Sequence, residues 1–312
     1  MRFDKALLQE LMRFRPAMPP VAALLEPPRL VGLRVAKARK DPTPLVVHEE
    51  PLPPGGGTYL PAGEALERPV ASLLAHLGQP KEIAVVVGDP FFRVQVLRLT
   101  DFPRNEEERT QVLLWQLRKL LNAPLDRVRL RYEVLERSTQ GAVVLAAVCP
   151  EEEAAAVESA FGQQGCRVGF LGPSTFALHA LWEAGGRFGE EAVLLLNHPE
   201  GYLSFLFLEG GRPVFFRCKD LQAFEAPEDG GGGRAAQELR LTLAYYREKL
   251  GGTEAPPILV RTSSGGHAFP FHGAVEEGAA LQSLAGVLPP LPTGAPRDEA
   301  ALPLFGVLEG CP

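Results

Sequence analysis

The turn Asn197–Gly201 (NHPEG) has the setting of a phosphate-binding turn but not its residues. It joins two apolar runs, Ala192–Leu196 and Tyr202–Leu208, which we expect to be neighbouring strands of a buried sheet. A metal–phosphate bound at such a turn needs a carboxylate for the metal and free backbone N–H groups for the phosphate. Asn197 carries no negative charge and Pro199 has no N–H. The turn therefore argues against nucleotide chemistry.

The run His48–Glu50 contains side chains of the types that bind metal ions. It lies in a segment that alternates like a strand, where neighbouring side chains point to opposite faces, so we expect no metal site there. The acidic triplets fit the first turns of helices better than acid/base pairs. The remaining histidines form no Ser/His/Asp spacing, and we expect no catalytic, cofactor-binding or metal-binding residues. These triplets and histidines are Glu106–Glu108, Glu151–Glu153, His179, His198, His267 and His272.

The composition is that of a globular protein with a hydrophobic core. The chain has 312 residues, of which 46% are hydrophobic and 22% charged, and its net charge of -6 disfavours nucleic acid as a partner. The four cysteines are far apart and form no metal or redox motif, which indicates buried thiols in a reducing compartment. No apolar run approaches the roughly 20 residues of a membrane span, and the charged N-terminus is not a signal peptide. Asp4–Phe14 predicts a short surface helix, with an interfacial membrane helix as the alternative.

Hydrophobic periodicity predicts a mixed α/β chain whose two halves each open with a β meander and continue with helices and strands. This is an internal duplication of architecture, and it predicts a bilobed protein. A strand–helix–strand unit, about 91–135, is expected as a compact subdomain beside the first lobe, inserted between buried strands Glu82–Gly88 and Ala142–Val148. The expected division is therefore an N-terminal helix and linker (1–28), a first lobe (29–185) and a shorter second lobe (186–312).

Several local motifs in this order resemble the actin-like PilM proteins of type IV pilus assembly and, more distantly, the cytoplasmic part of the secretion protein GspL. Leu99–Pro103 (LTDFP), Trp115 and Arg131–Leu135 (RYEVL) are similar to the family's extra subdomain. Leu206–Pro213 (LFLEGGRP) resembles the family's SVLRDGxP, and Gln237–Tyr246 resembles its EIxRSLxYY helix. The resemblance implies an actin-like fold, with ribonuclease H-like duplicated halves and an inserted strand–helix–strand subdomain.

The chain departs from this family at all three phosphate loops. Gly32–Lys37 is matched to the family's GIDIGSSSVK, which places Arg34 at the Asp position. Asn197 stands where the second loop has Asp, and Val260–Ser264 (VRTSS) where the third reads LSGGGA. Between Arg217 and the later helix there is room only for a linker, where the family has a subdomain that grips the nucleoside. We therefore expect a degenerate ATPase homologue that is no enzyme and has no cofactor.

The resemblance implies a cytoplasmic scaffold of a type IV pilus or secretion assembly platform. Its partner would be the tail of a PilN-like membrane protein, which holds the chain at the inner membrane together with other platform components. Apolar positions on the predicted strand Phe91–Leu99 suit a peptide groove, and Val94 is the expected partner-binding residue. An active ATPase or sugar-kinase-like enzyme of the same superfold is the alternative, and an adaptor unrelated to pili is a third reading.

Overall fold

A computed structural model describes residues 19–35, 44–55, 58–121, 125, 127–185, 192–221, 232–252, 254–262, 271, 280–288 and 299–310. The helix expected at Asp4–Phe14 lies outside the described residues, as do Cys311 and most of the expected linker before the later helix. In the described part, no helix is both long and apolar enough to cross a membrane.

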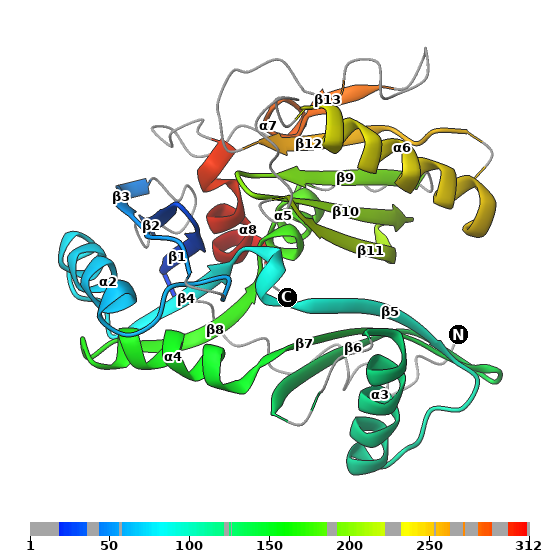
Figure 1. Ribbon diagram of the computed structural model, residues 1–312, viewed down its shortest axis with the longest axis horizontal. Coiled ribbons are helices and arrows are strands. Elements are labelled where there is room, and N and C mark those ends of the chain that lie inside the picture. Colours follow the sequence, from blue (N-terminus) through cyan, green and yellow to red (C-terminus); the bar gives the residue numbers. More distant parts are fainter. Residues whose placement is uncertain are drawn as a thin grey trace, which may run out of the picture.

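Two five-stranded sheets with the same topology form the two lobes (Figure 1). In each sheet an antiparallel meander of three strands is followed by two strands that continue the sheet in parallel. The first sheet has the order β3-β2-β1-β4-β8 and consists of β3 (Pro44–Pro51), β2 (Arg29–Val35), β1 (Val21–Glu26), β4 (Glu82–Val87) and β8 (Arg167–Pro173). The second has the order β11-β10-β9-β12-β13 and consists of β11 (Arg212–Asp220), β10 (Tyr202–Glu209), β9 (Ala192–His198), β12 (Ile258–Thr262) and β13 (Leu281–Ser283). The predicted duplication is therefore confirmed.

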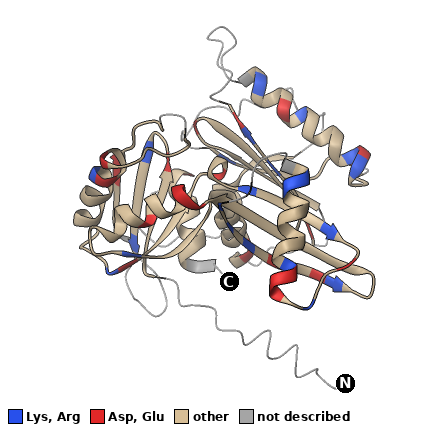
Figure 2. Cartoon of the chain, turned by 60° about the horizontal axis from the view of Figure 1, so that its bottom comes forward, with Lys and Arg blue, Asp and Glu red and all other residues tan. Residues whose placement is uncertain are grey.

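Helices cover both sheets because each apolar strand face needs a partner. The first sheet packs against α2 (Glu64–His76), α4 (Glu151–Gly162), α5 (Ser174–Ala184) and α8 (Leu302–Gly310), and the second against α6 (Gly232–Lys249). The short elements are η1 (Asp89–Phe91), α7 (Leu284–Val287) and η3 (Glu299–Ala301). Gly306 allows α8 to approach α5 closely, because a Cβ there would lie 1.8 Å from the carbonyl oxygen of Ala177. Figure 2 shows that charged residues lie mainly on outer helices and at strand ends.

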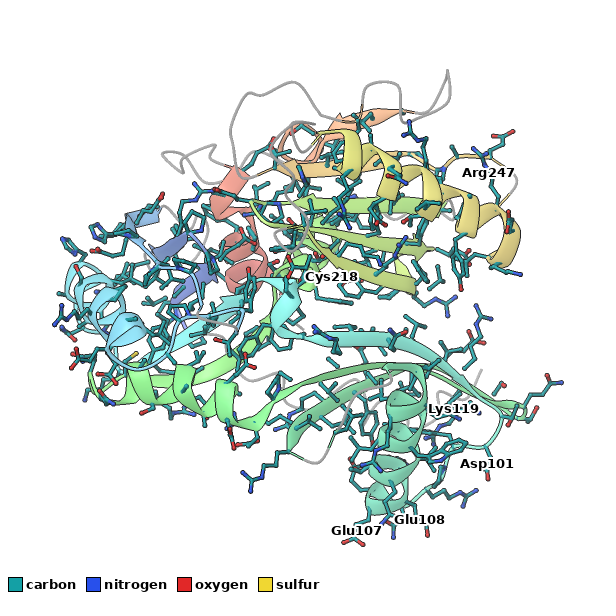
Figure 3. All side chains as sticks on the ribbon, in the orientation of Figure 1. Asp101, Glu107, Glu108, Lys119, Cys218 and Arg247 are labelled. Carbon is teal, nitrogen blue, oxygen red and sulfur yellow. The ribbon has the colours of Figure 1, made fainter. Side chains whose placement is uncertain are left out.

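A third, three-stranded sheet of order β5-β7-β6 stands beside the lobes. It consists of β5 (Arg93–Leu99), β7 (Gly141–Pro150) and β6 (Val128–Ser138), and α3 (Glu106–Leu121) packs against one of its faces. Figure 3 shows Glu107 and Glu108 at the lower end of α3 and Lys119 near its upper end. The oxygen Oδ1 of Asn105 accepts a hydrogen bond of 2.8 Å from the backbone N–H of Glu107, a capping contact at the start of α3.

Two strand predictions were wrong. Val21–Glu26, predicted as a linker, is the central strand β1, and all six of its residues are buried. Ala142–Val148, predicted as a buried strand that flanks the inserted unit, is the middle strand of the three-stranded sheet. We therefore propose to count Arg93–Pro150 as one inserted subdomain, longer than the expected 91–135.

Candidate functional site

Seven buried polar residues meet between the two lobes, where the central strands of both sheets end. From the first lobe come the end of β1, the turn after β4 and the start of α5. From the second lobe come the end of β9, the start of β10 and the end of β12. The seven are Glu26, Asp89, Ser174, Thr175, Asn197, Tyr202 and Arg261, and we call them the interlobe network.

Arg261 is the centre of the interlobe network, and its side chain is fully buried. Its Nη2 lies 2.9 Å from Oε2 of Glu26 and its Nη1 lies 3.1 Å from Oε1, so the pair is bidentate. Nη1 also donates to Oδ1 of Asn197 at 2.9 Å. Nε and Nη2 donate to the carbonyl oxygens of Glu299 and Ala300 at 3.0 and 2.9 Å. All five N–H groups of the guanidinium therefore have an acceptor, which a buried charge requires.

The electrostatics of this pair favour the charged state. Burial lowers the pKa of the Arg261 guanidinium, but the charge and hydrogen bonds of Glu26 raise it by more, so the net shift is upward. Glu26 also accepts a hydrogen bond of 2.6 Å from the hydroxyl of Tyr202. Burial raises the pKa of that phenol well above its usual value, which keeps it a donor at neutral pH.

Asp89 anchors the first-lobe side of the interlobe network. Its carboxylate accepts hydrogen bonds from the backbone N–H of Thr175 at 3.0 Å and from the Thr175 hydroxyl. The amide nitrogen of Asn197 lies 3.0 Å from the hydroxyl oxygens of both Ser174 and Thr175, which joins the second lobe to this cluster. Burial raises the pKa of Asp89, and the hydrogen bonds from Thr175 only partly offset this.

Ser174 lies at the start of α5 but does not cap this helix. The capping residue is Pro173, and Ser174 is the first helical residue. The hydroxyl of Ser174 instead shares a hydrogen bond of 2.6 Å with the hydroxyl of Tyr202. The hydroxyl of this first helical residue therefore takes part in a contact between the lobes.

The match of Arg34 to the first phosphate loop was wrong. Because the two sheets have the same topology, β1 corresponds to β9, and the counterpart of the turn after Asn197 is the turn that begins at Glu26. Arg34 lies further along, on β2, and its Nη1 donates to the carbonyl oxygen of Leu77 at 2.6 Å. The sequence prediction missed Glu26 because β1 had been read as a linker.

The two carboxylates of the interlobe network are already hydrogen-bonded to other residues of the chain. Both oxygens of Glu26 are bonded to Arg261, and one of them also to Tyr202. Asp89 is fully buried and held by Thr175. A divalent ion needs several accessible oxygen ligands. A metal–phosphate could use the Glu26 carboxylate as a ligand only if the Glu26–Arg261 pair broke. The arrangement is suited to holding two lobes together.

Val94, the expected partner-binding residue, lies in β5 opposite Ala147 of β7 and is 4% exposed. It belongs to the core that the insert shares with the lobes, and β5 contacts β11 of the second lobe without pairing to it. Val96 and its partner Leu145 lie on the same face of this sheet and are only half-buried. The apolar face expected on β5 is therefore present, with Val94 in its buried part, and partner binding at Val94 stays a prediction.

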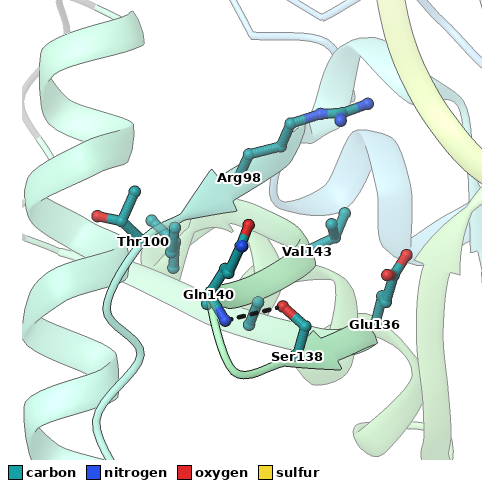
Figure 4. Close-up of a pocket in the computed structure, with 9 residues that line it drawn as sticks. Arg98, Thr100, Glu136, Ser138, Gln140 and Val143 are labelled. Carbon is teal, nitrogen blue, oxygen red and sulfur yellow. Dashed lines mark hydrogen bonds between the residues drawn. The ribbon is translucent and has the colours of Figure 1, made fainter.

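A shallow pocket of about 280 Å³ lies at the far end of the same sheet (Figure 4). It is formed by the end of β5 and the β6–β7 turn, where the backbone N–H of Gln140 donates to Oγ of Ser138 at 3.1 Å. Arg98 and Glu136 supply its charged groups. Glu136 also lies 3.8 Å from Arg212 of β11, so this end of the insert touches the second lobe.

Comparisons with solved structures support the fold. No protein-family model and no curated protein sequence match the chain. A structure described as a PilM–PilN type IV pilus biogenesis complex matches with a TM-score of 0.73 and 16% identity, over 94% of this chain and 98% of that one. A Bacteroides thetaiotaomicron protein with an actin-like ATPase fold has a TM-score of 0.56 and 8% identity, over 92% and 94% of the two chains. The cytoplasmic domain of EpsL, an inner-membrane component of the Vibrio cholerae type II secretion system, matches with a TM-score of 0.54 and 12% identity, over 93% of this chain and 95% of that one.

These similarities cover nearly the whole chain and agree with the resemblance inferred from the motifs. Both five-stranded sheets belong to the shared architecture, as the predicted fold class requires. The chain has the actin-like fold, and the PilM and EpsL structures are among its structural neighbours.

Proposed function

We propose that this protein is a nucleotide-independent scaffold of a type IV pilus or type II secretion assembly platform. The observation that carries the proposal is the Arg261–Glu26 pair. It joins β12 of one lobe to β1 of the other, at turns that correspond to the phosphate loops of the family that the motifs resemble. The similarity to PilM and to the EpsL cytoplasmic domain supports the choice of apparatus.

The chain itself supplies the bridge that a bound metal–nucleotide would otherwise form between the lobes. Arg261 provides the positive charge next to the first-lobe carboxylate, and Asn197 links Arg261 to Ser174 and Thr175. Such a bridge holds the two lobes in one arrangement without ligand. In our proposal the protein therefore neither binds nor hydrolyses ATP, and its platform role depends on its surfaces.

The partner in this proposal is the tail of a PilN-like membrane protein, because the similar PilM structure is a complex with PilN. Such a partner would hold the chain on the cytoplasmic side of the inner membrane, next to other platform components. We place the tail on the face of β5 and β7 that carries Val96 and Leu145. These side chains are half-buried and apolar, and burying them further would favour binding by the hydrophobic effect.

Substitution of Val96 tests this surface. Val96→Lys should abolish capture of the PilN homologue from the same organism, because it places a charge in the apolar face. Gln95→Lys is the matched control, since Gln95 is the neighbouring half-buried residue and points to the opposite face of β5. Equal capture by the two variants would contradict the placement. Val94→Asp would not distinguish lost binding from unfolding, since an unpaired charge at this buried position would also destabilise the fold.

A further inference from the structure

Three side chains of metal-binding type, none of them part of the interlobe network, meet at the edge of the first sheet. His48 and Glu50 lie two residues apart on β3, and therefore on one face of the strand. His76 comes from the last turn of α2. One potential ligand atom from each of the three lies within 4.8 Å of the others. The sequence argument against a site considered only neighbours such as Glu49 and could not see the contribution of α2.

The contacts around these side chains prepare them to act as ligands. Nε2 of His48 lies 2.7 Å from Oε1 of Glu50, and the Ser72 hydroxyl donates to the same oxygen at 2.5 Å. Nδ1 of His76 lies 2.9 Å from the carbonyl oxygen of Ser72, which can only accept. The His76 tautomer that satisfies this bond has its lone pair on Nε2. The His76 nitrogen that lies 4.0 Å from Oε1 of Glu50 is Nδ1, so the ring must turn to present its lone pair to a shared ion.

We infer that His48, Glu50 and His76 form a surface site for a divalent transition-metal ion such as Zn²⁺. Two imidazoles and one carboxylate are a common zinc ligand set, with water in the fourth position. Soft-to-borderline nitrogen ligands favour Zn²⁺, Ni²⁺, Co²⁺ and Cu²⁺ over Mg²⁺ and Ca²⁺, which prefer oxygen. A bound ion would link the edge strand β3 to the end of α2 through its ligands.

Loading requires two small movements. The rings of His48 and His76 are stacked, with centroids 3.6 Å apart and 13° between planes. An imidazole binds through a lone pair in its ring plane, so one ring must turn to share an ion with the other. His76 is able to turn because 53% of its side chain is exposed. His48 Nε2 and Glu50 Oε1 must also separate to about 3.3 Å, the spacing of two ligands bound tetrahedrally at about 2.0–2.1 Å.

Calorimetric titration of the chelator-treated full chain with Zn²⁺ at pH 7.5 tests the site. We expect one ion per chain, loss of binding in His48→Ala and His76→Ala, and affinity about tenfold weaker in Ser72→Ala, which removes the group that orients Glu50. Glu49→Gln is the control, because Glu49 is the neighbouring exposed carboxylate on the opposite face of β3. It should bind like the wild type.

Titration with Co²⁺ provides a second measurement. Four-coordinate Co²⁺ gives intense visible absorption, whereas hexaaqua Co²⁺ gives weak bands, so bound ions of the expected geometry are seen directly. Absence of saturable Zn²⁺ binding in the wild type would overturn the inference. So would Zn²⁺ binding of wild-type strength in His76→Ala, an exposed substitution that the fold should tolerate.

Discussion

At the scale of single residues, Arg261 is the side chain on which the proposed function depends most. It lies in a five-residue strand with no exposed position, and every donor of its guanidinium is used. In the sequence, Arg261 is one residue of Val260–Ser264, the segment that departs from the family's third phosphate loop. A lone Arg beside Thr and Ser is typical of a surface turn, so its burial was not expected. Its burial depends on Glu26, which is 235 residues away in the chain, and no local pattern contains that pairing.

The first prediction concerns removal of this arginine. Arg261→Met leaves Glu26 charged and unpaired in the core, so urea unfolding should show a loss of about 3–5 kcal/mol in the free energy of unfolding. The double variant Glu26→Gln with Arg261→Met removes both charges and should recover part of that loss. As a control, Arg167→Met breaks the exposed Arg167–Glu82 pair and should cost less than about 1 kcal/mol. A double variant as unstable as the single one would show that the unpaired charge is not the cause.

The second prediction concerns the pH dependence that Asp89 confers. Burial raises its pKa above the unfolded value of about 3.9, so the folded state holds this proton more tightly than the unfolded state does. The contribution of this group to stability is therefore greatest at low pH and is lost as the pH rises through the folded pKa. Asn at this position does not titrate and can still accept the Thr175 N–H. Denaturant unfolding at a series of pH values should show Asp89→Asn gaining stability relative to wild type as the pH rises above about 4, and a difference that does not change with pH would refute this.

At the scale of elements, local patterns placed most helices and strands but not their sheets. The first two strands of the meander β9–β11 were predicted within a few residues, α4 begins at the acidic triplet Glu151–Glu153 as expected, and the helix motif Gln237–Tyr246 lies within α6. The strand β1 (VAALLE) was missed, because Ala and Leu favour a helix as readily as a strand and prolines flank it. The sheet to which β7 belongs could not be read from its alternation, because alternation fixes which face is buried and not which strand lies alongside.

The third prediction concerns how the insert is attached to the first lobe. Arg129 of β6 lies between two carboxylates of α4, with 2.8 Å from Nε to Oε2 of Glu151 and 2.9 Å from Nη2 to Oε2 of Glu158. These hydrogen bonds raise the pKa of Arg129. Arg129→Ala should destabilise the protein by about 1 kcal/mol, because the pair is partly exposed, and should speed hydrogen exchange in β6.

Arg131 is the matched control for this element. It is exposed on the same strand, and its Nη1 donates to the carbonyl oxygen of Leu130 beside it. Arg131→Ala should leave the exchange of β6 unchanged. Equal acceleration in both variants would mean that the contacts to α4 do not hold the insert in place.

At the scale of the whole molecule, the duplicated sheets and their shared core make one bilobed body. A continuous hydrophobic core joins strands of both lobes with α5 and α8, and the interlobe network lies beside it. The duplication could be predicted because each half repeats its order of elements. The network could not, because it depends on how the halves face each other. An actin-like protein whose lobes are bonded through its own side chains is expected to keep one arrangement without ligand.

The most direct test of this account is a calorimetric titration of the wild-type protein with ATP in the presence of Mg²⁺. The account predicts no saturable heat at any ATP concentration up to the millimolar range, because the groups that would hold the metal and phosphates are bonded to each other. Glu26 and Arg261 would have to separate before either could hold a metal–nucleotide. Magnesium-dependent binding with a micromolar dissociation constant would contradict the account and favour the alternative, an active ATPase of the same fold.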